Sequence, residues 1–181
     1  YAALDKYPLV AVPFFILAGN LMEASGISER MVEFAKSLVG GVQGGLAISC
    51  VLTCMIFAAV AGSSVATTFA VGAILIPAML KHGYPRPFAA SLQATAAELG
   101  VIIPPSVPMI LFAVSTDTSV GELFIAGIGP GILIALALMF YVWVYAKRHG
   151  YGKNDGAGRL PVGVALRRAW LALMMPVIIL G

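Results

Sequence analysis

Charged residues are scarce in this chain, and their scarcity excludes most soluble folds. Only 10% of the 181 residues are Asp, Glu, Lys or Arg, while 60% are hydrophobic, and the mean hydropathy is +0.97. A soluble domain carries roughly 25% charged residues to cover its surface. We therefore expect an all-α polytopic membrane protein. The net charge of +3 is small and the basic residues are scattered between apolar runs, so we expect no nucleic-acid partner.

Cysteine is almost absent as well, which limits the chemistry that the chain can carry. Cys50 and Cys54 lie one helical turn apart in an apolar run, where a disulfide has poor geometry and a metal lacks further ligands. We interpret both as small buried side chains. His82 and His149 show no zinc-binding spacing, and no P-loop occurs, so neither an enzyme nor an ATPase is predicted and no organic cofactor is expected.

Apolar runs and turn residues divide the chain into segments. Each limb of the run around "GSS" is near or below the roughly 20 residues of a spanning helix, which favours a re-entrant hairpin over two short complete spans. The chain begins at Tyr1 and stops inside an apolar run, so we expect a piece of a longer protein. The predicted segments are a transmembrane helix at 1–24, an amphipathic arm helix at 25–41, a hairpin at 42–81 with its tip at 62–64, a broken transmembrane helix at 86–116 with the break at 100–106, a transmembrane helix at 122–147, a cytoplasmic linker and second arm helix at 148–168, and the start of another transmembrane helix at 169–181.

The distribution of charge predicts the orientation in the bilayer. If the hairpin returns the chain to the side it left, one face carries Lys6 with Asp5, Asp117 and Glu122. The opposite face carries nearly all the basic residues and is therefore predicted to be cytoplasmic. Those residues are Arg30, Lys36, Lys81, Arg86, Lys147, Arg148, Lys153, Arg159, Arg167 and Arg168.

Three prolines interrupt the apolar segment "GVIIPPSVP". Pro104, Pro105 and Pro108 have no N–H group, so the carbonyls of Gly100, Val101 and Pro104 lose their usual helical donors and become available to a cation. Secondary transporters build ion and substrate sites from such broken helices near the middle of the bilayer. Pro105 and Ser106 suit the start of a second half-helix.

The hairpin tip predicts a matching break. Gly62 permits a sharp turn, and Ser63 or Ser64 can cap the second limb. The carbonyls that end the first limb favour a cation, and the N–H groups that begin the second favour an anion such as a carboxylate. Hydroxyl groups for a substrate are expected from Ser64, Thr67, Thr68 and Ser106.

Four other polar residues lie within apolar segments. Ser91, Thr95 and Glu98 share one helical face, and an intramembrane carboxylate binds a cation, carries a proton or bonds a neighbouring helix. Asn20 is interpreted as a helix-packing amide or a ligand.

Four linked motifs lie along the chain, namely "FFILAGNLMEASGISERMVEFAKSLVG", "AAVAGSSVATTFAVGAILIPAMLKHGYP", "GVIIPPSVPMI" and "SVGELFIAGIGPG". Together they resemble the large membrane (DctM-like) subunit of tripartite ATP-independent periplasmic (TRAP) transporters. The resemblance covers nearly the whole chain and implies the first inverted repeat of an elevator-type transporter, in which Na⁺ drives the import of organic acids such as C4-dicarboxylates or sialic acids. It implies a small DctQ-like membrane subunit and a periplasmic DctP-like binding protein as partners, in the bacterial inner membrane. It also implies a Na⁺ site formed by Gly62–Ser64 and Gly100–Ser106 through carbonyl oxygens and serine hydroxyls.

Other functions stay open at this point. A proton- or Na⁺-coupled anion carrier of another inverted-repeat family, which uses Glu98, fits the same features. A non-transporting scaffold or channel subunit fits less well, because two broken helices are costly without a ligand to place.

Overall fold

The computed structural model describes residues 25–152 and 161–180, together with the isolated positions 9, 12–14, 17 and 21. Asn20, most of the helix predicted at 1–24, and residues 153–160 lie outside the described residues. Within the described ranges the regular structure is helical and contains no strand, in agreement with the predicted all-α class.

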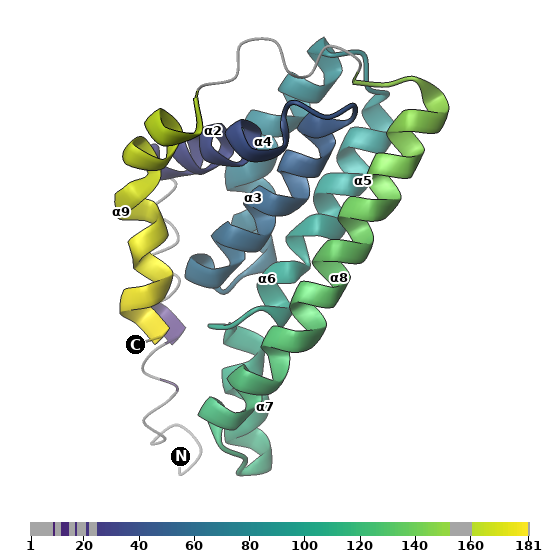
Figure 1. The fold of residues 1–181 in the computed structure, drawn as a ribbon. Helices are drawn as coiled ribbons and strands as arrows, with labels where there is room; N and C mark the ends of the chain where they lie inside the picture. The colour runs from purple at the N-terminus through teal and green to yellow at the C-terminus, as the bar shows by residue number, and fades with distance from the viewer. Residues whose placement is uncertain are drawn as a thin grey trace.

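Eight helices follow one another along the described chain, and they are labelled in Figure 1. Two of them, α4 and α8, are long and apolar enough to cross a membrane, and the bent pair formed by α5–α6 and α7 is a third candidate span. Helix α3 is apolar but shorter. The bounds are α2 (Ile27–Val39), α3 (Gly45–Ala61), α4 (Ser64–Lys81), α5 (Arg86–Ala97), α6 (Leu99–Ile102), α7 (Val107–Thr116), α8 (Val120–His149) and α9 (Val162–Leu180).

Helix α3 lies at the centre of the molecule. Its sequence, GLAISCVLTCMIFAAVA, is apolar on every side, as expected of a helix surrounded by others. It packs against α2, α4, α5 and α8, and Val51 and Phe57 are fully buried in these contacts. The tip of the hairpin, where α3 turns into α4, lies part-way along α8, level with the break between α6 and α7 (Figure 1).

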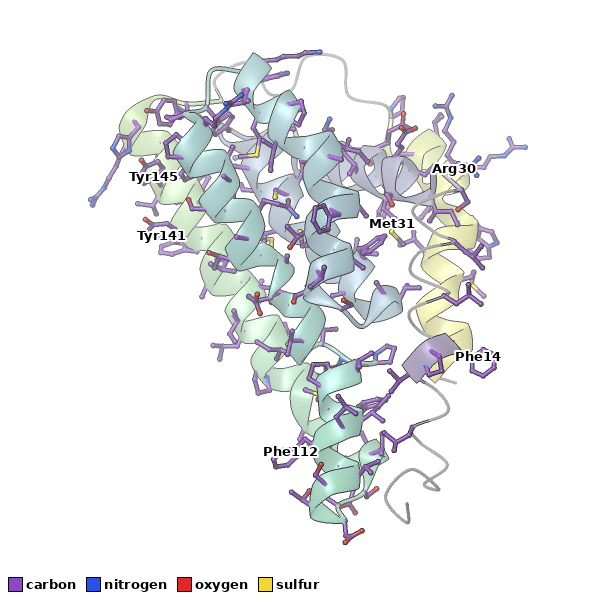
Figure 2. The ribbon with its side chains drawn as sticks, turned by 180° about the vertical axis from the view of Figure 1, so that it is seen from behind. Phe14, Arg30, Met31, Phe112, Tyr141 and Tyr145 are labelled. Atoms are coloured by element: carbon purple, nitrogen blue, oxygen red, sulfur yellow. The ribbon has the colours of Figure 1, made fainter. Side chains whose placement is uncertain are left out.

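Helix α2 lies across the bundle rather than along it (Figure 1). It is amphipathic, with Met31 fully buried and its neighbour Arg30 exposed. Figure 2 shows these two side chains on α2, beside the upper part of α9. An exposed ion pair between Arg168 and Glu33, with 3.5 Å between Nη1 and Oε2, joins α9 to α2.

Helix α9 differs from the predicted division of this region. The sequence predicted an arm helix up to residue 168 and a separate span from 169. The structure contains one helix, Val162–Leu180, that continues through this junction. No Gly or Pro lies between Val164 and Met175, so the local sequence offers nothing that would end a helix at 168.

A group of stacked rings fastens one end of the bundle. Tyr84 follows α4, Phe88 belongs to α5, and the Phe88 ring stacks on Tyr145 of α8 with 4.7 Å between centroids. His149 stacks on Tyr145 at 4.1 Å and on Tyr151 at 5.8 Å. Figure 2 shows Tyr145 near this end of α8. We name these five residues the base cluster; they connect the end of the hairpin, the start of α5 and the end of α8.

Glycines on α8 allow the broken helix to approach closely. A Cβ atom added at Gly127 would lie 2.7 Å from the Ile102 carbonyl oxygen, and one at Gly131 would lie 2.6 Å from Cγ1 of Ile103. Gly129, on the same helix, has nothing within 4 Å. The backbone of α8 thus contacts the broken helix directly at the point where α6 ends.

We predict that Gly127→Ala destabilises the protein and that Gly129→Ala does not. Alanine at 127 must displace a backbone carbonyl, which typically costs about 1–3 kcal/mol, whereas alanine at an exposed helical glycine gains up to about 1 kcal/mol. The free energy of unfolding of the purified full-length protein in detergent measures both effects. Equal unfolding free energies for the two variants would contradict the close approach of α8 to Ile102.

Candidate functional site

The hairpin tip consists of Gly62 and Ser63. Gly62 has a φ of 61°, in the left-handed region that favours glycine, and its N–H donates to the Ala58 carbonyl at 3.1 Å to end α3. Ser63 is the N-cap of α4, and its hydroxyl accepts from the Ala66 N–H at 3.4 Å. Of the two predicted caps, Ser63 rather than Ser64 is therefore the one that the structure uses.

The break in the helix that runs through α5, α6 and α7 covers fewer residues than the predicted range 100–106. Helical backbone continues through Gly100 and Val101 to Ile102, and the chain then bends by 42° before α7. Ser106 caps α7, accepting from the Met109 N–H at 3.4 Å. The peptide bond between Pro104 and Pro105 is cis.

These two breaks lie against each other. The Val107 N–H donates to the Gly62 carbonyl at 3.2 Å, so the start of α7 is bonded to the hairpin tip. A Cβ atom at Gly62 would lie 2.8 Å from the Pro105 carbonyl oxygen, and one at Gly100 would lie 3.0 Å from the Ser63 carbonyl. At both positions an alanine methyl group would press on backbone atoms rather than on a side chain, most severely at Gly62. We name this contact between Gly62–Ser64 and Gly100–Ser106 the paired breaks.

Oxygen atoms at the paired breaks differ in how they are already bonded. The Val101 carbonyl accepts from the Ser106 hydroxyl at 2.6 Å, which replaces the donor that Pro105 lacks. The Gly100 carbonyl, in α6, has Pro104 at the position of its helical donor, whereas Pro104 lies between α6 and α7, and the structure describes no donor to its carbonyl. The Ser64 hydroxyl is half-buried and has no hydrogen-bond partner among the residues that the structure describes. These three groups have the most capacity for a ligand.

The two threonines of α4 are directed to their own helix. The Thr67 hydroxyl donates to the Ser63 carbonyl and the Thr68 hydroxyl to the Ser64 carbonyl, each at 2.8 Å. Thr67 is fully buried, whereas Thr68 is half-buried. In this conformation Thr68 is closer to being presented to a substrate than Thr67.

Glu98 lies away from the paired breaks. It shares an exposed face of the broken helix with Ser91 and Thr95, whose hydroxyls donate to carbonyls of their own helix. Gly100, two residues later, points to the hairpin, and residues two apart lie on opposite sides of a helix. Within the described part of the chain, the Glu98 carboxylate has neither a hydrogen-bond partner nor an ion-pair partner.

Sequence analysis missed Gln93. This glutamine of α5 is only 1% exposed, and its amide lies between the two limbs of the hairpin. Its signal in the sequence was a single amide in an apolar helix. The same helix also contains Ser91 and Thr95 and is followed by Glu98. The helical periodicity did not indicate which of these four polar side chains faces the hairpin.

Two clefts in the described structure contrast in chemistry, and the apolar one borders the paired breaks. An apolar groove of about 300 Å³ beside the break is lined by Met55, Ile56, Ala59, Ile103, Pro104, Ile128 and Ile132. A polar cleft of about 510 Å³ lies between α2 and the start of α9, away from the paired breaks, and includes Arg30, Glu33 and Arg168. The described residues contain no group of three or more His, Cys, Asp or Glu side chains that fits a metal site.

A comparison of the whole sequence identifies the family. Residues 1–181 match the DctM component of the tripartite ATP-independent periplasmic transporters. The chain belongs to this family. Together with the apolar helices, membership indicates a multi-pass membrane protein of the TRAP large-permease type, as the four motifs predicted.

Curated relatives of the DctM family match nearly all of the chain. The C4-dicarboxylate TRAP transporter large permease protein DctM of Rhodobacter capsulatus is 39% identical over 195 residues, covering 100% of this chain and 44% of that protein. The sialic acid TRAP transporter large permease protein SiaM of Vibrio cholerae is 39% identical over 178 residues (98% and 42%). The isethionate TRAP transporter permease protein DctMQ of Oleidesulfovibrio alaskensis is 43% identical over 182 residues (100% and 29%).

All three relatives are transporter permeases rather than enzymes. The chain spans less than half the length of each of them.

We predict that Gly62→Ala destabilises the protein more than Gly83→Ala. Both glycines have positive φ, so both substitutions incur about 1–2 kcal/mol of backbone strain. Only at Gly62 does the added methyl group also meet the Pro105 carbonyl, which adds about 1–3 kcal/mol. Thermal unfolding of the purified full-length protein compares the two. If both variants unfold at the same temperature, the hairpin tip and the break are not in contact.

Proposed function

We propose that this chain is part of the large permease of a Na⁺-coupled secondary transporter that imports organic acids across the bacterial inner membrane. The single observation that carries the proposal is the contact of the paired breaks in a DctM-family chain. Ion and substrate sites of secondary transporters are built where such discontinuous helices meet. The chain then represents the first inverted repeat of an elevator-type transport core, with α3 and α4 as a re-entrant hairpin.

Electrostatics supports binding of both ion and substrate at the paired breaks. The C-terminal end of α3 carries the partial negative charge of its last carbonyls, which favours Na⁺. The Gly100 and Pro104 carbonyls and the Ser64 hydroxyl supply further oxygens. The N-terminal ends of α4 and α7 carry partial positive charge, which favours a substrate carboxylate. Candidate substrate groups are the half-buried Ser64 and Thr68 hydroxyls, with the fully buried Thr67 and Ser106 hydroxyls behind them.

The proposed transporter works with two partners. Family membership supports a small membrane subunit and a periplasmic binding protein that delivers the organic acid, and one relative is a DctMQ permease. The substrates named for the three relatives differ, so the panel for this protein includes C4-dicarboxylates, isethionate and sialic acid.

A second function is favoured by one observation, the unpartnered carboxylate of Glu98 on the exposed face of the broken helix. An intramembrane carboxylate without a partner suits proton coupling. The same experiment separates this function from Na⁺ coupling.

We predict Na⁺-dependent uptake that is weakened by Ser64→Ala. The full-length permease, its small subunit and its binding protein are reconstituted in proteoliposomes, and uptake of the radiolabelled panel is measured with and without an inward Na⁺ gradient. Removing one oxygen ligand is expected to raise the half-saturating Na⁺ concentration about tenfold, equivalent to about 1.4 kcal/mol. Ser115→Ala is the matched control, because the Ser115 hydroxyl is exposed and bonded to its own helix.

Glu98→Gln completes this experiment. Under Na⁺ coupling through the paired breaks, this variant keeps its Na⁺-driven uptake. Uptake that ignores Na⁺, follows a pH gradient and is lost in Glu98→Gln would contradict the proposal and support proton coupling. Absence of any panel uptake, with or without either gradient, would favour a non-transporting subunit.

A further inference from the structure

Gln93 differs from every other buried polar side chain that the structure describes. The buried hydroxyls of Ser37, Ser49, Thr67 and Ser106 donate to carbonyls three to five residues away in sequence. Those of Ser28 and Thr53 have no partner. Among the described buried Ser, Thr and Gln side chains, Gln93 is the one that forms hydrogen bonds with two other helices, α3 and α4.

The Gln93 amide joins both limbs of the hairpin. Its Oε1 accepts from the Cys50 thiol of α3 at 3.1 Å, and its Nε2 donates to the Thr67 carbonyl of α4 at 3.3 Å. The Cys54 sulfur, also on α3, makes longer contacts with the same amide, at 3.6 Å to Nε2 and 3.9 Å to Oε1. The stem of the side chain passes Gly72 of α4, where an added Cβ would lie 3.1 Å from the Gln93 Cγ. The position of the amide therefore depends on α3, α4 and α5 together.

A chain of hydrogen bonds leads from Gln93 to the hairpin tip. Gln93 bonds the carbonyl of Thr67, and both the N–H and the hydroxyl of Thr67 bond the carbonyl of Ser63, at 3.1 and 2.8 Å. Ser63 in turn lies against Gly100, seven residues beyond Gln93 along the broken helix. The first turn of α4 is thus held to the broken helix at two points, Thr67 to Gln93 and Ser63 to Gly100.

Two-point attachment determines the distance between the two segments of the paired breaks. An ion held by oxygens from both segments requires them within about 0.5 Å of the productive geometry. The Gly100 contact alone leaves α4 free to pivot about Ser63, and the Gln93 bond restrains that pivot.

We infer that Gln93 is a positioning residue that sets the Na⁺ affinity of the paired breaks by holding α4 against the broken helix. Gln93 acts through Thr67 and Ser63 and does not itself touch the ion. This inference rests on the proposed Na⁺ coupling. It adds Gln93, which lies behind the site, as a residue that determines how tightly the ion is held.

The test uses Na⁺ alone as the probe. The full-length permease is purified with its small subunit, and its unfolding temperature is measured against NaCl concentration, with choline chloride keeping the ionic strength constant. Gln93→Met has similar length but forms neither hydrogen bond, so the Na⁺ concentration for half-maximal stabilisation is expected to rise about tenfold. Cys50→Ala removes the Cys50 bond and leaves the longer Cys54 contacts and the Thr67 bond in place, so it is expected to give a smaller rise in the same direction.

Ser49→Ala is the matched control. Ser49 is a buried residue adjacent to Cys50, and its hydroxyl donates to Gly45 of its own helix at 2.7 Å. This variant is expected to lower the unfolding temperature in choline chloride without changing the half-saturating Na⁺ concentration. A purely structural role for Gln93 would give the same result in Gln93→Met and would overturn the inference.

Gln93→Glu provides a rescue that a structural role does not predict. A protonated carboxyl group reproduces both the acceptor and the donor of the amide, whereas the ionised form loses the donor and buries a charge. We divide the half-saturating Na⁺ concentration of this variant by that of the wild type at the same pH. This ratio is expected to fall towards one on acidification. A ratio that stays well above one at every pH would overturn the inference, whereas a ratio near one throughout supports it, because a buried carboxyl group that stays protonated reproduces the amide. If Gln93→Met does not fold, Cys50→Ala and Gln93→Glu supply the measurement.

Failure of the inference is distinguishable from failure of the proposed function. A wild-type permease that Na⁺ does not stabilise relative to choline would overturn the Na⁺ coupling and this inference with it. A wild type stabilised by Na⁺, with the half-saturating concentration unchanged in Gln93→Met and Cys50→Ala, would overturn the inference alone.

Discussion

The structure depends on one constraint, namely that backbone N–H and carbonyl groups in apolar surroundings need partners. Two segments interrupt their helices, and each supplies partners for the other. The Val107 N–H reaches the Gly62 carbonyl across the contact, while Ser63 and Ser106 cap the helices that restart. Neither break would be stable alone in hydrocarbon. Their contact is therefore both the condition for two broken helices in this fold and the reason why polar groups meet there.

Much of this contact could be predicted from the sequence because its determinants are local. Gly62 and Ser63 signal a turn and a cap, and the prolines remove specific donors whatever the surroundings. The details that sequence missed depend on tertiary contacts. The Ser106 hydroxyl satisfies the Val101 carbonyl, which the missing donor of Pro105 had left open. Likewise, helical periodicity places Gln93 and Glu98 on particular faces but does not say which face the hairpin covers.

The aromatic contacts that hold the helices together and the proposed binding site lie in different parts of the molecule. The base cluster joins the end of the hairpin, the start of α5 and the end of α8 through stacked rings. The paired breaks, where we propose that Na⁺ and an organic acid bind, lie at the opposite end of the hairpin (Figure 1). Stacked aromatic rings add about 0.5–1.5 kcal/mol per pair beyond their buried area. Such a base leaves the tip as the part of the hairpin whose position depends on hydrogen bonds.

Direct backbone contact at the paired breaks has a consequence for how such permeases diverge. When a side chain grows in an ordinary core, a neighbouring side chain can shrink to restore the fit. Gly62 faces the Pro105 carbonyl and Gly100 faces the Ser63 carbonyl, so each glycine meets main chain that no substitution can make smaller. At neither position can a smaller neighbouring side chain make room for a larger residue. If the paired breaks bind a substrate, as proposed, we expect differences in preference to arise in the surrounding hydroxyl and amide side chains, which can change without moving the main chain.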